Sequence, residues 1–195
     1  MTLFERTAMR PLTITLALAA GLLWAPAAWA QKVRLSTSMG DVVLQLEADK
    51  APKTVANFVQ YVKAGHYNGT VFHRVIDGFM VQGGGMSAEM QEKATRAPIP
   101  LESRNGLSNV RGSLAMARTN VPDSATAQFF INLADNQRLD AANSPDGNGY
   151  AVFGKVVEGM DVVERIRAVA TGNRAGHQNV PLQAIVIKQA TLINP

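Results

Sequence analysis

Residues 72–84 read Phe72-His73-Arg74-Val75-Ile76-Asp77-Gly78-Phe79-Met80-Val81-Gln82-Gly83-Gly84. Strand-forming residues stand on both sides of Asp77-Gly78, a dipeptide typical of tight turns. We therefore predict strands over residues 70–76 and 79–82, with the glycine run 83–85 ending the second strand. Because side chains alternate along a strand, we expect Phe72, Arg74 and Ile76 to share one face of the first strand. By the same rule, Met80 and Gln82 share a face of the second.

Two adjacent phenylalanines, Phe129 and Phe130, lie in the predicted strand 128–133. Neighbouring side chains in a strand point to opposite faces of the sheet. One ring can therefore fill a core while the other lies outside it, and Gln128 shares a face with Phe130. A large apolar ring on an outer face requires an explanation.

The rest of the chain contains strand and helix patterns separated by turns. One amphipathic helix is predicted from Pro52 to Gly65 and another from Asp161 onwards, and residues 86–110 are predicted as a long surface loop. These elements predict a mainly β fold, a closed eight-stranded antiparallel barrel with an α-helix at each open end. The remaining predicted strands cover residues 32–37, 41–47, 113–117, 150–157 and 184–193.

The composition of the 195 residues excludes several classes of protein. There is no cysteine, which rules out disulfides, thiol nucleophiles and cysteine-ligated metals. The 19 basic and 15 acidic residues give a net charge of +4, but no run of Lys or Arg suggests a phosphate-binding face. We therefore expect no nucleic-acid partner.

The N-terminal segment has the pattern of an export signal. Arg6 and Arg10 precede an uncharged stretch over residues 11–31, which ends in Ala28-Trp29-Ala30, with small residues where a signal peptidase requires them. We predict a signal peptide over residues 1–30, cleaved after Ala30, and one domain over residues 31–195 with no stable membrane association after cleavage. The alternative is an uncleaved membrane anchor, because the uncharged stretch is about as long as a bilayer requires.

Several ordered motifs resemble those of the cyclophilins, which are peptidyl-prolyl cis-trans isomerases. The resemblance extends from about Val33 to Leu192. It rests on residues 72–84 together with Gly112-Ser113-Leu114-Ala115-Met116-Ala117, Gln128-Phe129-Phe130-Ile131, Leu139-Asp140 and Phe153-Gly154-Lys155-Val156. Further motifs at residues 105–107, 116–119 and 123–126 resemble the bacterial exported branch, which implies a periplasmic protein.

The resemblance implies a packed barrel whose substrate groove lies on its outer surface. The implied substrates are proline-containing unfolded or flexible polypeptides, the implied role is assistance of protein folding, and we expect a monomer that needs no cofactor and no metal. Arg74 is implied as the hydrogen-bond donor to the proline nitrogen, and Gln82 as a second catalytic residue. The implied substrate-binding residues are Phe79, Met80, Ala117, Arg118, Gln128, Phe130, Leu139 and Tyr150.

Three residues depart from the pattern of eukaryotic cyclophilins. Arg118 replaces a common Asn at a position where the family uses a backbone contact to the substrate. Tyr150 stands where a His is frequent, and Arg138 stands where a Trp forms one wall of the groove. The last change is expected to remove an aromatic wall.

Other interpretations remain beside the isomerase. The protein could capture proline-containing segments with little turnover, in which case the donor Arg74 would not be needed. It could also carry a small ligand inside the barrel, which large inward side chains would exclude. Three other kinds of site lack the spacing that each requires. They are a hydrolase triad around Ser113 or Ser124, a phosphate loop at Gly83–Gly85, and a metal site at His66, His73 or His177. We interpret His73 as a structural residue of its strand.

Overall fold

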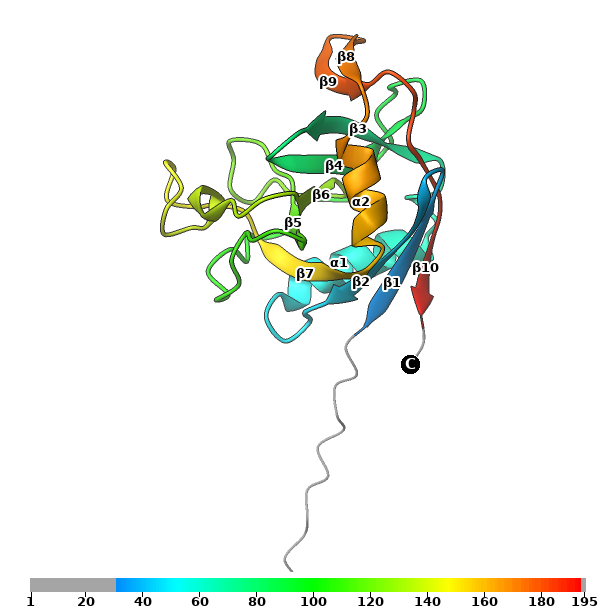
Figure 1. The fold of residues 1–195 in the computed structure, drawn as a ribbon. Helices are drawn as coiled ribbons and strands as arrows, with labels where there is room; N and C mark the ends of the chain where they lie inside the picture. Colours follow the sequence, from blue (N-terminus) through cyan, green and yellow to red (C-terminus); the bar gives the residue numbers. More distant parts are fainter. Residues whose placement is uncertain (1–30, 194–195) are drawn as a thin grey trace, which may run out of the picture.

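A computed structural model describes residues 31–193. The predicted signal peptide, with its cleavage point after Ala30, lies outside the described residues. Within residues 31–193, eight antiparallel strands close a barrel in the order β1-β10-β3-β4-β6-β5-β7-β2, as the sequence predicted (Figure 1). These barrel strands are β1 (Lys32–Thr37), β2 (Gly40–Leu46), β3 (Thr70–Ile76), β4 (Met80–Ser87), β5 (Ser113–Met116), β6 (Phe129–Asn132), β7 (Val152–Glu158) and β10 (Val186–Ile193).

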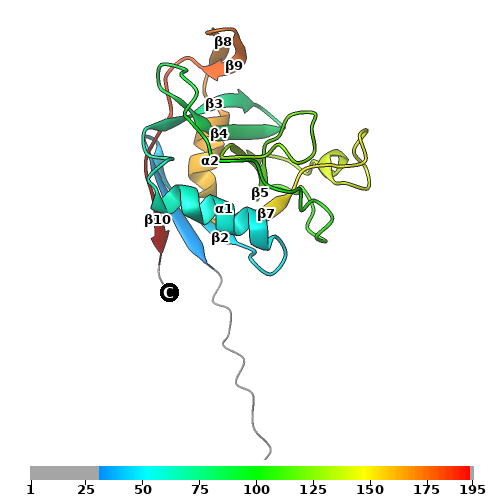
Figure 2. The same cartoon turned by 180° about the vertical axis from the view of Figure 1, so that it is seen from behind.

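Two helices cover the barrel openings, α1 (Pro52–Lys63) and α2 (Met160–Arg167). Helix α2 crosses the opening that faces the viewer in Figure 1, and α1 crosses the opposite one, seen in Figure 2. Pro52 stands in the first turn of α1, where its missing N–H costs no hydrogen bond. Phe58 from α1 and Ile166 from α2 both join the core of the barrel. Neither helix, within the part of the chain described, is long and apolar enough to span a membrane.

A two-stranded hairpin outside the barrel was not predicted. It consists of β8 (Thr171–Arg174) and β9 (His177–Pro181), and it stands beyond β3 at the top of Figure 1. Its turn contains Ala175 and Gly176, with φ angles of 49° and 78°. Consecutive left-handed residues form the turn type that matches the twist of a hairpin, but Asn or Gly is the usual first residue. Because Ala175 is atypical at that position, the sequence pattern did not predict the turn.

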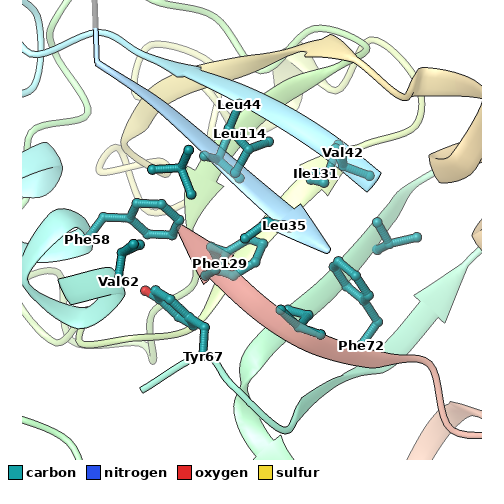
Figure 3. Packing of buried hydrophobic residues seen from close by; sticks show 14 of the residues in the cluster. Leu35, Val42, Leu44, Phe58, Val62, Tyr67, Phe72, Leu114, Phe129 and Ile131 are labelled. Carbon is teal, nitrogen blue, oxygen red and sulfur yellow. The ribbon is translucent and has the colours of Figure 1, made fainter. Parts of the chain in front are cut away.

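Phe129 lies in the centre of the barrel. Its ring packs edge-on against the rings of Phe58, Tyr67 and Phe72, with centroid separations of 5.6, 5.6 and 6.2 Å (Figure 3). Phe130 belongs to a separate apolar cluster on the outer face, so the predicted division of the two rings is confirmed. Fully buried aromatic and aliphatic side chains fill the interior, which excludes the interpretation that the barrel carries a ligand inside.

Two expectations about β3 and β4 were wrong. The glycine run 83–85 does not end a strand, since β4 continues to Ser87. Phe72 also does not share a face with Arg74, because it packs in the core whereas Arg74 lines an outer cavity. The pairing register explains both: Phe72 pairs with Gly83 and Arg74 with Gln82, which leaves His73 as an extra residue in a β-bulge. The next pair is Val71 with Met86, so Gly84 and Gly85 are extra on the other strand.

The glycines at this double bulge allow β4 to approach the core rings closely. A Cβ atom at Gly84 would lie 2.9 Å from both the Phe129 and the Tyr67 rings, and Gly84 has a φ of +86°. A Cβ at Gly83 would lie 2.9 Å from the Phe72 ring. Glycine is therefore required here by the size of the rings as well as by backbone conformation.

Replacing Gly84 by Ala tests this requirement, with Gly69→Ala as its control. Gly69 has a similar φ of +77°, but its Cβ would meet nothing within 4 Å. Gly69→Ala should lower the free energy of unfolding by about 1–2 kcal/mol, the cost of a left-handed alanine. Gly84→Ala should lower it by about 1–3 kcal/mol more, because the rings must also move. Urea unfolding measures both, and equal losses would contradict the ring contact.

Candidate active site

A cavity of about 120 Å³ lies on the outer face of the barrel. Of the ten predicted site residues, nine line it: Arg74, Phe79, Met80, Gln82, Ala117, Arg118, Phe130, Leu139 and Tyr150. The tenth, Gln128, lies beside it and is hydrogen-bonded to Gln82. The structure therefore brings together residues that are as much as 76 positions apart in the sequence, from Arg74 to Tyr150.

Three polar side chains form a row along one edge of the cavity. The Nη1 of Arg74 donates to Oε1 of Gln82 at 3.4 Å, and Nε2 of Gln82 donates to Oε1 of Gln128 at 2.9 Å. The backbone leaves room for this row, since a Cβ at Gly85 would lie 2.4 Å from the Cγ of Gln128. Gly85 thus lets Gln128 fix Gln82, and the oxygen of Gln82 orients the guanidinium of Arg74.

The apolar part of the cavity rests on Met80 and Phe130, which are almost completely buried. The ring of Tyr150 packs edge-on against Phe130 with centroids 5.7 Å apart. Arg138 lies at the edge of this surface, where its guanidinium stacks over the Phe79 ring at 4.8 Å. An arginine can stack flat on an aromatic face. Arg138 therefore covers the Phe79 ring with a cationic group.

The side chain of Arg118 is held by the protein itself. Its Nε donates to the carbonyl of Gly149 at 2.8 Å, its Nη2 pairs with the Asp146 carboxylate, and its guanidinium stacks over Tyr150 at 4.7 Å. The backbone N–H of Asn148 and the guanidinium of Arg118 hold the pKa of Asp146 well below its usual range, so this carboxylate stays charged. Arg118 therefore holds Tyr150 and the loop before it against the cavity.

A network of buried amides supports the cavity, and no sequence motif indicated it. Asn136 donates through Nδ2 to the Phe79 carbonyl and to Oδ1 of Asn132, both at 2.8 Å. Asn132 donates in turn to Oδ1 of Asn109 at 3.2 Å, and Asn109 donates through its backbone N–H to Asp140 at 2.7 Å. These bonds fix the turns that carry Phe79 and Leu139. Single Asn residues spread over the chain form no local motif, so the residues could not be identified in advance.

His73, the bulged residue of β3, is buried beside Arg74, and its Nδ1 has no hydrogen-bond partner among the described residues. Burial, followed by the nearby His177, lowers its pKa to about 4. His73 is therefore neutral above about pH 5. Within the described residues, no group of three or more His, Asp or Glu side chains is placed to hold a metal ion.

Comparison with protein families shows the family of the chain. Residues 32–192 match the model of the family described as cyclophilin type peptidyl-prolyl cis-trans isomerase/CLD. The chain belongs to the cyclophilin family. It is a peptidyl-prolyl cis-trans isomerase, like its relatives, and the eight-stranded barrel is the fold of the family.

Bacterial cyclophilins are similar over nearly the whole described domain. The chain is 56% identical to peptidyl-prolyl cis-trans isomerase cyp18 of Streptomyces antibioticus over 162 residues. This match covers 83% of the chain and 98% of the relative. The chain is 53% identical to peptidyl-prolyl cis-trans isomerase B of Escherichia coli (strain K12) over 161 residues, with 82% of the chain and 98% of the relative covered.

A solved cyclophilin has the same fold. A cyclophilin-type isomerase of Cryptosporidium parvum matches with a TM-score of 0.71 and 26% identity, over 86% of this chain and 99% of that one. The same protein was crystallised in the presence of the dipeptide Ala-Pro, and this second structure matches with a TM-score of 0.70 and 26% identity, over 85% of this chain and all of that one.

The row of polar side chains leads to a prediction about Gly85. Gly85→Ala places a Cβ against Gln128, so Gln128 must turn away and Gln82 loses its partner. We expect kcat/KM for an Ala-Pro peptide to fall by about threefold to tenfold, since one neutral hydrogen bond contributes about 1 kcal/mol. A protease-coupled isomerisation assay measures it. Unchanged kcat/KM in a folded variant would show that Gln128 does not position Gln82.

Proposed function

We propose that this cyclophilin isomerises Xaa-Pro bonds of exported polypeptides in the periplasm, with Arg74 as the donor to the proline nitrogen. The observation that carries the proposal is the position of Arg74, at the border of a small apolar cavity and oriented by the Gln82–Gln128 pair. Met80, Phe130 and Leu139 would hold the proline ring. Gln82 and the backbone near Arg118 would hold the residue before it.

The chemistry requires no covalent intermediate. Resonance between nitrogen and carbonyl resists rotation of the bond, with a barrier of about 18–20 kcal/mol. In the twisted transition state this resonance is lost, and the proline nitrogen becomes a pyramidal acceptor. A guanidinium N–H aimed at it therefore stabilises the transition state more than either planar ground state. Each tenfold in rate corresponds to about 1.4 kcal/mol of such difference.

A module that only captures proline-containing segments needs the apolar cavity but not the donor. A site that binds only the planar ground state would need no more than Phe79, Met80, Phe130 and Leu139. The row from Arg74 to Gln128 supports the enzyme instead, because it fixes a guanidinium beside the ring site.

We also propose a monomer. The large exposed apolar side chains of the described residues, Val110, Val121, Val157 and Leu182, come from four separate segments of the chain.

The donor role predicts the behaviour of Arg74 variants. Arg74→Ala should lower kcat/KM for an Ala-Pro peptide by about tenfold to a hundredfold, which is roughly 1.4–2.8 kcal/mol. Arg74→Lys should also be impaired, because an ammonium lacks the planar fork of donors. Arg34→Ala, which removes an exposed arginine on β1, serves as the control and should keep wild-type activity.

In wild type, kcat/KM should be nearly flat from about pH 6 to pH 8, since His73 with its pKa of about 4 stays neutral there.

Two results would contradict the donor role. One is wild-type turnover by a folded Arg74→Ala protein. The other is a steep loss of activity near the ordinary pKa of histidine, about 6.5, that disappears in His73→Gln. The second result would move the chemistry from Arg74 to its neighbour.

The proposed export has its own test. Mass spectrometry of the protein recovered from the producing cell should show a chain that begins at Gln31. The expectation follows from the small residues Ala28 and Ala30, which match a cleavage site. Full-length protein in the membrane fraction would favour the uncleaved anchor instead.

A further inference from the structure

A second, larger cavity of about 360 Å³ lies on the other side of Arg74. One wall consists of His73 and Arg74 from β3, together with Gln82, Met86 and Gln128, and the other consists of residues 176–179 from the β8–β9 hairpin. We call it the hairpin hollow. Figure 1 shows the hairpin beyond β3, close to the end of α2 and far from α1.

The hairpin hollow adjoins the 120 Å³ cavity that is proposed to hold the proline ring, which we call the proline cavity. Arg74 and Gln82 line both, so the two cavities meet at the proposed donor. Ala117 and Arg118, whose backbone is proposed to hold the residue before the proline, do not line the hairpin hollow but a third cavity on the other side of Gln82. A polypeptide bound through its proline would therefore direct the residues after the proline toward the hairpin hollow.

Both walls of the hollow are formed by irregular strands. Consecutive side chains of a regular strand point to opposite sides, yet His73 and Arg74 both line the hollow because β3 has its bulge at His73. In the hairpin, Gly172 pairs with Val180 and Arg174 with His177, so Gln178 and Asn179 stand opposite the single residue Asn173.

The extra residue of β9 has an unusual backbone. Asn179 has a φ of 59°, a left-handed conformation that asparagine adopts more readily than most residues other than glycine. This bulge allows three consecutive side chains, from His177 to Asn179, to line the same hollow. Bulges that direct extra side chains toward one place are frequent next to functional sites.

The lining of the hollow is suited to an anion. Its lining residues carry the guanidinium of Arg74, the side-chain amides of Gln178 and Asn179 and the ring N–H of His177 as donors, and they include no Asp or Glu. A guanidinium with nearby amide donors matches the two oxygens of a carboxylate. We propose that the hairpin hollow is a second substrate subsite, which binds the side-chain carboxylate of a Glu that stands two residues after the proline.

The inference rests on the proposed proline site and adds a substrate preference to it. Three peptides test it, Ac-Ala-Ala-Pro-Ala-Xaa-Ala-NH2 with Glu, Gln or Lys at Xaa, and NMR exchange spectroscopy measures the catalysed isomerisation of each. Wild type should show a KM for the Glu peptide about fivefold to tenfold below that for the Gln peptide, and the highest KM for the Lys peptide. The amide signals of residues 176–179 should shift on titration with the Glu peptide.

A charge placed in the hollow should reverse the preference. In Gln178→Glu, the new carboxylate repels the Glu peptide, so the Lys peptide should have the lower KM. Gln189→Glu is the matched control, since it makes the same change of charge on the exposed surface of β10, which is not part of the hollow. It should leave the order of the three peptides as in wild type.

Two outcomes would overturn the subsite. One is equal KM values for the Glu and Gln peptides in wild type, and the other is a Glu preference that survives in Gln178→Glu. Both leave the proposed proline site intact as long as wild type turns over all three peptides and Arg74→Ala turns them over at least about tenfold less efficiently. Wild-type turnover by a folded Arg74→Ala protein would instead contradict the proline site itself.

Discussion

The ring of Phe129 packs edge-on against Phe58, Tyr67 and Phe72, and these four rings fix which face of β6 is inside the barrel. Because neighbouring side chains alternate, Phe130 must then lie outside, where it becomes the base of the proline cavity. The filled interior leaves no room for a ligand. An enzyme of this fold therefore works on the outer surface of its barrel, where a polypeptide in an extended conformation can reach the site.

The same rings impose the irregular pairing of β3 and β4. The two strands come so close to Phe72, Tyr67 and Phe129 that only glycine fits at Gly83 and Gly84, and the register shifts around these residues. One shift makes His73 a bulge and turns Arg74 outward. Close packing inside the barrel and the outward position of Arg74 thus have one physical cause.

Much of this could be predicted from the sequence where the signal is local. The alternation of Phe129 and Phe130, the turn at Asp77-Gly78 and Pro52 at a helix start each depend on a few neighbouring residues. The bulge at His73 depends on ring volumes contributed by distant segments, so strict alternation placed Phe72 on the wrong face. The amide network of Asn109, Asn132 and Asn136 also depends on distant segments. The candidate site residues were inferred from motifs shared with a known family. The bulge and the amide network that hold them in place could be seen only in the structure.

The central claim is that proline binds outside the barrel with its nitrogen facing Arg74. The most direct measurement is a crystal structure of residues 31–195 with a bound Ala-Pro peptide. The account predicts the proline ring between Met80, Phe130 and Leu139, with an Arg74 guanidinium N–H directed at the proline nitrogen. A proline ring bound elsewhere on the barrel, or an Arg74 turned away from the bound peptide, would contradict it.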